Sequence, residues 1–202
     1  FLGKVTHFPI VEIATRIALG ETLKDMGYHS GLMPAKKHVA AKAPVFSFSK
    51  IGLAEIALGP EMKSTGEVMG IGHSYSEALY KAVNGAKMKI PAGGTILVTV
   101  ADRDKAEALQ LAEGFKELGY HIIATEGTGK YFNDHGMPVD IVRKIHEGGQ
   151  NIATLIRNGK IDLVLNTLTY GKHPERDGFN LRRMVVELAV PCLTSLDTAR
   201  EV

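Results

Sequence analysis

The chain has 202 residues, of which 45% are hydrophobic and 23% are charged, and its formal net charge is +2. This length and composition fit one large or two small globular domains that can bury a substantial core. The small net charge, with acidic and basic residues interspersed, argues against nucleic acid or a membrane surface as a partner.

The single cysteine, Cys192, has no partner for an internal disulfide, which predicts a reducing, cytoplasmic location. Its neighbours Val190, Pro191 and Leu193 are apolar, so we expect a buried structural thiol. The chain opens at Phe1 within sequence that has the pattern of ordered structure, from which we expect a piece of a longer polypeptide.

The first ninety residues predict little regular structure. Residues 9–19 have the spacing of an amphipathic helix, residues 45–48 alternate like a strand, and residues 74–85 predict a helix with Ser74 as its N-cap. Between them, residues 59–70 combine Gly59, Pro60, Gly66 and Gly70 with charged and hydroxyl residues. This density of glycine and proline predicts a fixed, non-repetitive backbone rather than a surface helix.

A breaker cluster at residues 91–94 separates this region from a more regular second half. Apolar strands are predicted at residues 95–100, 121–124, 139–142, 161–165 and 191–194. Helices are predicted between them at residues 102–118, 127–135, 152–158 and 181–189, with a short helix at the end. Alternating strands and helices predict an α/β fold, a Rossmann-like, doubly wound parallel sheet. Ligands of such sheets bind beyond the carboxyl ends of the strands.

Polar residues follow four of the predicted strands at those ends. Thr125-Glu-Gly-Thr-Gly129 opens a helix, where free backbone N–H groups and the helix dipole favour an anion; a capped helix without a ligand is the alternative interpretation. Lys105, Lys144, Asn166 and Thr167 lie at the other strand ends. Together, two lysines, hydroxyls and an amide suit a phosphorylated small molecule.

Residues 59–70 also resemble the segment that joins the second ATP-grasp unit to the regulatory domain in the large subunit of carbamoyl phosphate synthetase. Residues 1–9 resemble the continuation of that ATP-grasp unit beyond its metal-binding Asn-Pro-Arg string. Residues from about 93 to the end are similar to the methylglyoxal-synthase-like fold, which that subunit uses as its allosteric domain. The resemblance implies a remnant of an ATP-grasp domain with a linker at residues 1–91 and the allosteric domain at residues 92–202.

The resemblance further implies which residues hold the phosphate of an effector such as UMP, IMP or phosphoribosyl pyrophosphate: Lys105, Thr125, Thr128, Lys144, Asn166 and Thr167. This chain departs from bacterial relatives at Leu168, where a second threonine is frequent. The sequence of its loop at residues 169–173 also differs from the pattern of those relatives. Lys63 and Glu67 are candidates for a relay between the domains. Ala43 stands where relatives that respond to ornithine have a glutamate, so no ornithine control is expected.

The parent would be an ATP-dependent ligase that joins bicarbonate and glutamine-derived ammonia, with ATP and Mg or Mn bound upstream of this region. The partners implied are the remainder of the large subunit and the small glutaminase subunit. For the fragment itself we expect no catalytic residue, no cofactor and no activity. The eight histidines show no metal-ligand spacing, and none of them predicts a metal site.

Two alternatives remain. A methylglyoxal synthase-type lyase acting on dihydroxyacetone phosphate needs carboxylates to move protons at carbon. The positions of that family's two aspartates are occupied here by Gly149 and Thr169, which disfavours the lyase, and we expect a structural role for the adjacent His146 and Glu147. A structural module that binds no small molecule is the other alternative.

Overall fold

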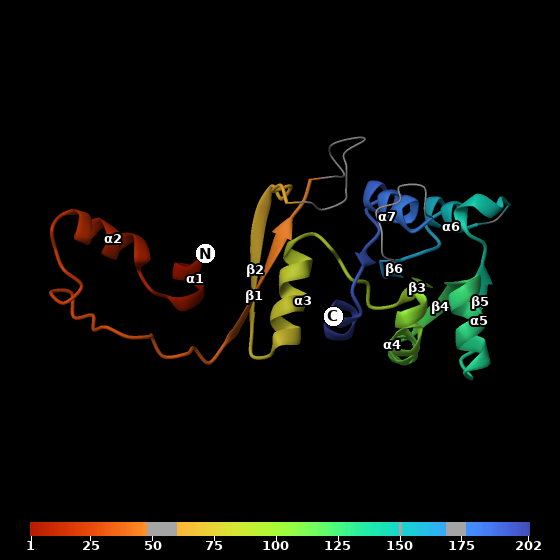
Figure 1. Ribbon diagram of the computed structural model, residues 1–202, viewed down its shortest axis with the longest axis horizontal. Coiled ribbons are helices and arrows are strands. Elements are labelled where there is room, and N and C mark those ends of the chain that lie inside the picture. The colour runs from red at the N-terminus through yellow and green to blue at the C-terminus, as the bar shows by residue number, and fades with distance from the viewer. Residues whose placement is uncertain (48–59, 150, 169–176) are drawn as a thin grey trace.

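The computed structural model describes residues 1–47, 60–149, 151–168 and 177–202. A five-stranded sheet lies in the second half of the chain and a two-stranded sheet in the first (Figure 1). The larger sheet contains β3 (Gly94–Thr99), β4 (Tyr120–Thr125), β5 (Asp140–Val142), β6 (Leu163–Asn166) and β7 (Cys192–Leu193). Its order is β5-β4-β3-β6-β7 and every pair is parallel, which confirms the predicted α/β fold.

Helices cover both faces of this sheet. Because successive side chains of a strand point to opposite faces, Ile96 and Val98 of β3 face one core cluster and Leu97 faces another. The first cluster is completed by α4 (Lys105–Glu117), α5 (Glu126–Asp134) and α8 (Leu196–Glu201), and the second by α6 (Ile152–Arg157) and α7 (Asp177–Glu187). The sheet is therefore doubly wound, as the alternating pattern predicts.

The predicted boundaries in this half are close to the observed ones. A short 3-10 turn, Asp102–Asp104, occupies the start of the predicted helix at 102–118, and another, Ile145–Glu147, follows β5. Helix α7 begins at Asp177, ahead of the predicted start at Leu181.

In the first half, β1 (Val39–Val45) pairs antiparallel with β2 (Gly66–Gly72), and α3 (Tyr75–Gly85) packs on both. The Ser74 side chain accepts a hydrogen bond from the Glu77 N–H, as predicted for an N-cap. The strand predicted at residues 45–48 is wrong: Phe46 and Ser47 follow the end of β1, and Phe48 lies outside the described residues.

The non-repetitive backbone predicted for residues 59–70 is also wrong from Gly66 onward, since these residues belong to β2. Gly59 lies outside the described residues. The physical reason is the packing of Gly70 against α3. A Cβ atom at this position would lie 1.9 Å from the Ala78 carbonyl oxygen and 2.6 Å from the Ala82 nitrogen. Glycine here permits close contact between a strand and a helix rather than an irregular loop.

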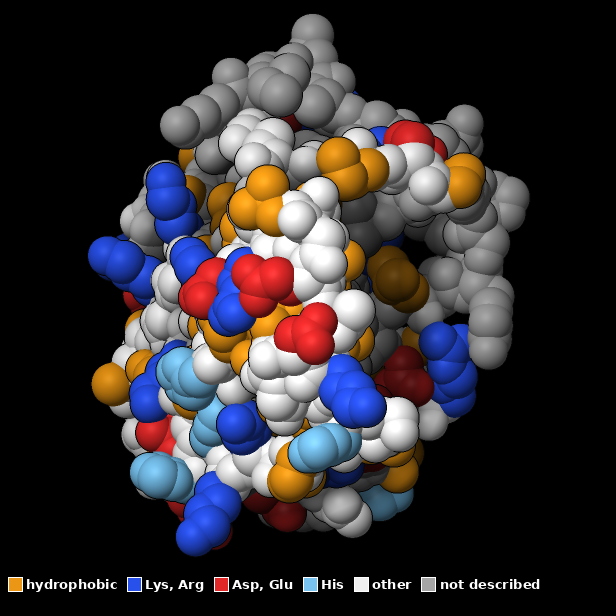
Figure 2. All heavy atoms as spheres, turned by 90° about the vertical axis from the view of Figure 1, so that its left-hand side faces the viewer, with side chains coloured by type: hydrophobic (Ala, Val, Ile, Leu, Met, Phe, Trp, Pro, Cys, Tyr) orange, Lys and Arg blue, Asp and Glu red, His pale blue; other side chains and the backbone are white. Residues whose placement is uncertain are grey.

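Two short helices, α1 (Leu2–Thr6) and α2 (Ile10–Ala18), precede the small sheet and lie at the end of the molecule opposite α5 (Figure 1). Of the apolar side of α2, only Ile13 is buried, whereas Ile10 and Ile17 are 40% and 45% exposed. Figure 2 looks onto this end, where hydrophobic and charged side chains lie intermixed.

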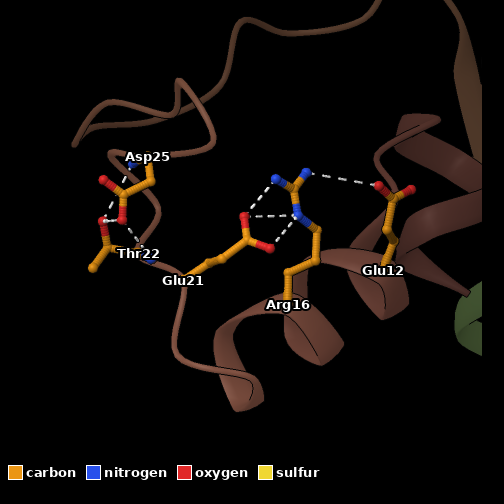
Figure 3. A network of polar contacts seen from close by, with 5 residues as sticks. All are labelled: Glu12, Arg16, Glu21, Thr22 and Asp25. Atoms are coloured by element: carbon orange, nitrogen blue, oxygen red, sulfur yellow. Dashed lines mark hydrogen bonds and ion pairs between the residues drawn. The ribbon is translucent and has the colours of Figure 1, made fainter.

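A polar network ends α2. Arg16 points toward Glu21 on one side and Glu12 on the other (Figure 3), with Nη2–Oε2 and Nη1–Oε1 distances of 2.5 and 3.9 Å. The hydrogen bond from Arg16 lowers the pKa of the Glu21 carboxyl. Thr22 and Asp25 then cap each other, the Asp25 carboxylate accepting from the Thr22 N–H at 3.0 Å. Within the described ranges, no helix combines the length and apolar character needed to cross a bilayer.

Candidate functional site

The predicted site residues of the second half gather at one edge of the five-stranded sheet. Because all strands are parallel, their carboxyl ends meet at this edge. Thr125 ends β4, Asn166 ends β6, Lys105 begins the helix after β3, and Lys144 follows β5 by two residues. The buried polar side chains among the described residues are Asn151 together with Thr125, Thr128, Asn166 and Thr167.

Two threonine hydroxyls hold the chain as it leaves β3. Thr128 Oγ1 accepts a hydrogen bond from the Val100 N–H at 3.3 Å, and Thr167 Oγ1 accepts from the Ala101 N–H at 2.9 Å. A hydroxyl that accepts in this way retains its own hydrogen for donation. The two side chains can therefore stabilise the fold and donate to an anion at the same time.

Thr99 connects the neighbouring strand ends. Its hydroxyl accepts from Thr125 Oγ1 at 3.1 Å, and its carbonyl oxygen accepts from Asn166 Nδ2 at 3.0 Å. The ends of β4, β3 and β6 are thus joined side to side by polar groups. Sequence reasoning did not select Thr99, although Thr99 is the last residue of β3 as Thr125 is of β4.

Lys105 lies beside the first turn of α5. A Cβ atom on Gly127 would be 3.6 Å from Lys105 Nζ, which places the ammonium in contact range of the helix start. The Lys105 side chain is 16% exposed and its Nζ lies 2.7 Å from Asp102 Oδ1. This contact lowers the pKa of the Asp102 carboxyl. A cation beside the free N–H groups of a helix start is an arrangement that can attract an anion.

Lys144 also lies near the start of α5, where it attracts the Glu126 carboxylate. Its backbone N–H donates to Glu147 Oε2 at 2.9 Å, which fixes the turn after β5. Its side chain lines a cavity of about 30 Å³ together with Thr99, Thr125 and Asp177. The pKa of the Glu126 carboxyl is lowered, chiefly by its hydrogen bond from Lys130, and Lys144 adds a smaller attraction.

The predicted structural role of His146 and Glu147 has a clear geometry. Glu147 holds the backbone of Lys144, and His146 Nδ1 lies 2.7 Å from Asp177 Oδ2 at the start of α7. These contacts connect the turn after β5 to α7 across the cavity. Neither residue is positioned as part of a metal cluster, and the described ranges contain no group of three or more His, Cys, Asp or Glu side chains suited to a metal.

Arg182 of α7 is a further polar residue at this edge. Its Nη1 donates to Asn166 Oδ1 at 2.6 Å, so the Asn166 amide is held on both sides. Sequence reasoning missed it because Arg182 and Arg183 form a pair on a predicted helix, and nothing in the sequence tells which of them faces the sheet. Burial lowers the pKa of Arg182.

The remaining predicted residues lie elsewhere. Lys63 forms an ion pair with Glu61 at 3.0 Å, and Glu67 pairs with Lys42 on the two-stranded sheet. Gly149 has a φ of +65°, and Thr169 lies outside the described residues. The larger hollow of about 300 Å³, lined by Lys116, His121 and Asp140, lies at the amino ends of β4 and β5, away from all of these residues.

Residues 107–194 match the model of the MGS-like domain family. One similar solved structure is a methylglyoxal synthase from Elizabethkingia anophelis NUHP1, 22% identical, covering 55% of this chain and 77% of that one with a TM-score of 0.44. Another is that of ForH, 21% identical, covering 54% of this chain and 76% of that one with a TM-score of 0.37. The matched residues contain four of the five strands of the parallel sheet, so the second half of the chain has an MGS-like α/β fold.

Proposed function

We propose that this chain is a regulatory part of the large subunit of carbamoyl phosphate synthetase. In this proposal residues 1–91 are the end of the second ATP-grasp unit with its linker, and residues 92–202 bind a phosphorylated effector. The parent enzyme joins bicarbonate and glutamine-derived ammonia with ATP and Mg or Mn. Its other parts, the rest of the large subunit and the small glutaminase subunit, are the expected partners.

The observation that carries the proposal is the arrangement around the start of α5. Lys105 and Lys144 both lie near it, and the buried Thr125 and Thr128 belong to the same turn. Backbone N–H groups at a helix start, two cations and hydroxyl donors are the groups that bind a phosphate. A purely structural module gives no reason to place two lysines against one helix start.

The residues at the two positions where the lyase family has aspartates support regulation rather than catalysis. Gly149 and Thr169 carry no carboxylate, so neither can take a proton from a carbon acid. The anion-binding groups are present without this pair of bases. A domain of this composition is suited to hold a ligand without converting it.

An effector bound at this edge changes the parent only through a difference in affinity between two states of the protein. A polar route leads from α4 toward the first half: Glu107 pairs with Arg200 of α8, and the neighbouring Glu201 accepts from Ser76 of α3. Helix α3 packs on β2, which carries the proposed relay residue Glu67. This route is how ligand binding near Lys105 would reach the small sheet.

The test is calorimetric titration of UMP, IMP and phosphoribosyl pyrophosphate into the full chain and its Lys144→Ala variant. Loss of one charge-assisted hydrogen bond, about 1.5–3 kcal/mol, should weaken binding of the effector by roughly ten- to a hundredfold. Lys130→Ala is the matched control, because Lys130 lies on α5 but pairs with Glu126 at the exposed surface. Equal affinities in all three proteins would remove Lys144 from the site.

A methylglyoxal synthase-type lyase is the second candidate, favoured by the family match and by the Asp177 carboxylate at the cavity. This carboxylate is bonded to His146, which makes it a candidate base. The discriminating measurement is release of inorganic phosphate from dihydroxyacetone phosphate. Turnover that is lost in Asp177→Asn would favour the lyase, whereas binding without turnover would favour the effector domain.

A further inference from the structure

The Lys105 cation is paired with a carboxylate of its own chain, beside the helix start where the proposed phosphate binds. Its Nζ lies 2.7 Å from Oδ1 of Asp102, which belongs to the 3-10 turn just before α4. The two side chains differ in exposure, since that of Lys105 is 16% exposed and that of Asp102 is 95% exposed. The cation is therefore packed into the fold, whereas its counter-ion extends into solvent.

Asp102 is the acidic group that pairs with Lys105 within the described ranges. The ammonium also lies 6.0 Å from the centroid of the Tyr131 ring, which is neutral and supplies no compensating charge. Lys105 holds the pKa of the Asp102 carboxyl below its ordinary value, so this carboxylate is charged at pH 7. An anion that contacts Lys105 must therefore take the place of Asp102, and a carboxylate that remains nearby repels it.

The turn that carries Asp102 is held by bonds that do not involve its side chain. The Ala101 N–H donates to Thr167 Oγ1 at 2.9 Å. The Arg103 guanidinium donates through Nη2 to the Leu168 carbonyl oxygen at 2.8 Å. Because these contacts fix the main chain, the exposed Asp102 carboxylate can rotate away from Lys105 while the turn keeps its shape.

A phosphate beside Gly127 would make contacts that the Asp102 carboxylate does not make. Within the described ranges, this carboxylate accepts from Lys105 and from no N–H group at the start of α5. A phosphate group has a charge of about −1.5 to −2 at pH 7 and three acceptor oxygens, so it can bind the ammonium and the helix N–H groups together. Replacement of Asp102 by phosphate is therefore favourable, but the lost ion pair reduces the gain.

We propose that Asp102 is an internal competitor of the ligand: its carboxylate occupies Lys105 until a phosphate group displaces it, and this competition sets the affinity of the site. This inference rests on the proposed function, because it concerns the same phosphate site. Asp102 weakens binding in two ways, through the ion pair that must be broken and through the repulsion between two anions beside one lysine. Removal of its charge should therefore tighten binding.

The experiment titrates inorganic phosphate at pH 8 into the full chain and follows the amide NMR signals of Gly127 and Thr128. Asp102→Asn should bind phosphate about three- to tenfold more tightly than the unmodified chain. Asp104→Asn is the matched control, because it removes the same charge from the same turn but its carboxylate pairs with Arg103 at 3.4 Å. Its affinity for phosphate should change by less than about twofold, since solvent and salt screen the more distant charge.

Asp102→Ala separates the effect of charge from that of hydrogen bonding. An asparagine amide can itself donate to phosphate, whereas alanine cannot, so the alanine variant should also bind more tightly than the unmodified chain. Unchanged affinity in Asp102→Ala, or an equal gain in Asp104→Asn, overturns this inference and leaves the phosphate site intact. If phosphate shifts the Gly127 and Thr128 signals in none of these proteins, the phosphate site is refuted, and the proposed function with it.

Discussion

The contact between Gly70 and α3 gives the sharpest prediction for stability. In Gly70→Ala the new methyl group would meet the Ala78 carbonyl oxygen at 1.9 Å and the Ala82 nitrogen at 2.6 Å. Comfortable contact needs about 3.5 Å, so strand and helix must separate by roughly 1.5 Å. Both contacted atoms are main-chain atoms of α3, and neither can rotate away as a side chain would.

The separation would open the small core made by Ala41, Ala78 and Ala82. Overpacking of this kind costs about 1–3 kcal/mol, and the main-chain clash favours the upper limit, about 3 kcal/mol. For a chain of this size that corresponds to a decrease in Tm of roughly 6–12 °C. The assay is urea and thermal unfolding followed by circular dichroism, with α3 amide exchange as a local probe.

Gly66→Ala is the matched control on the same strand. Its new methyl group would lie 3.7 Å from the Val45 Cβ, an ordinary contact, and stability should change little. If the free energies of unfolding of Gly70→Ala and Gly66→Ala differ by less than about 0.5 kcal/mol, the close packing of β2 on α3 is refuted.

The remaining predictions concern a thiol, a hydroxyl and the proposed relay. Cys192 is half-buried, and desolvation raises the pKa of its thiol to about 12, compared with about 8.5 for an unfolded thiol. Stability should therefore fall between these pH values by up to about 1.4 kcal/mol per pH unit. Cys192→Ala should remove this component from a pH series of urea unfolding curves, and an unaltered slope would show that the thiol is exposed. Thr128→Val deprives the Val100 N–H of its acceptor and should cost about 1–3 kcal/mol in the same assay, while Thr128→Ser should cost less; equal losses would assign the effect to packing. Lys63→Ala and Glu67→Gln in the full-length large subunit should change how strongly the effector alters the rate of carbamoyl phosphate synthesis. If the response to effector is intact while the rate of synthesis is lost, residues 59–70 support catalysis instead.

The five-stranded sheet was predictable because its strands are short apolar runs separated by glycine and helical spacing. Residues 96–98 and 163–165 are fully buried and face both core clusters, and such strands carry a strong sequence signal. The place of the polar residues that follow these strands was predictable from the parallel direction of the strands. Once the strands are parallel, Thr125 and Asn166 must lie at one edge.

The small sheet was not predictable by these patterns. Residues 39–45 contain three alanines, a lysine and a proline, which have low strand propensity, and their partner strand contains three glycines. The close approach of α3, rather than residue preference, selects this sequence. Arg182 was missed for a different reason, since its importance depends on the rotation of α7 and therefore on packing that the sequence pattern does not record.

The strand order of the large sheet has a consequence for synthesis of the chain on the ribosome. The central strand β3 pairs with β6, and the joined residues Thr99 and Asn166 are 67 positions apart. At about 5–20 residues per second, β3 waits on the order of several seconds for its second neighbour to be translated. During that time one edge of a very apolar strand has unpaired N–H and carbonyl groups, which makes the nascent chain prone to intermolecular pairing. Late closure of the sheet, rather than the stability of the finished fold, would then limit the yield of folded protein.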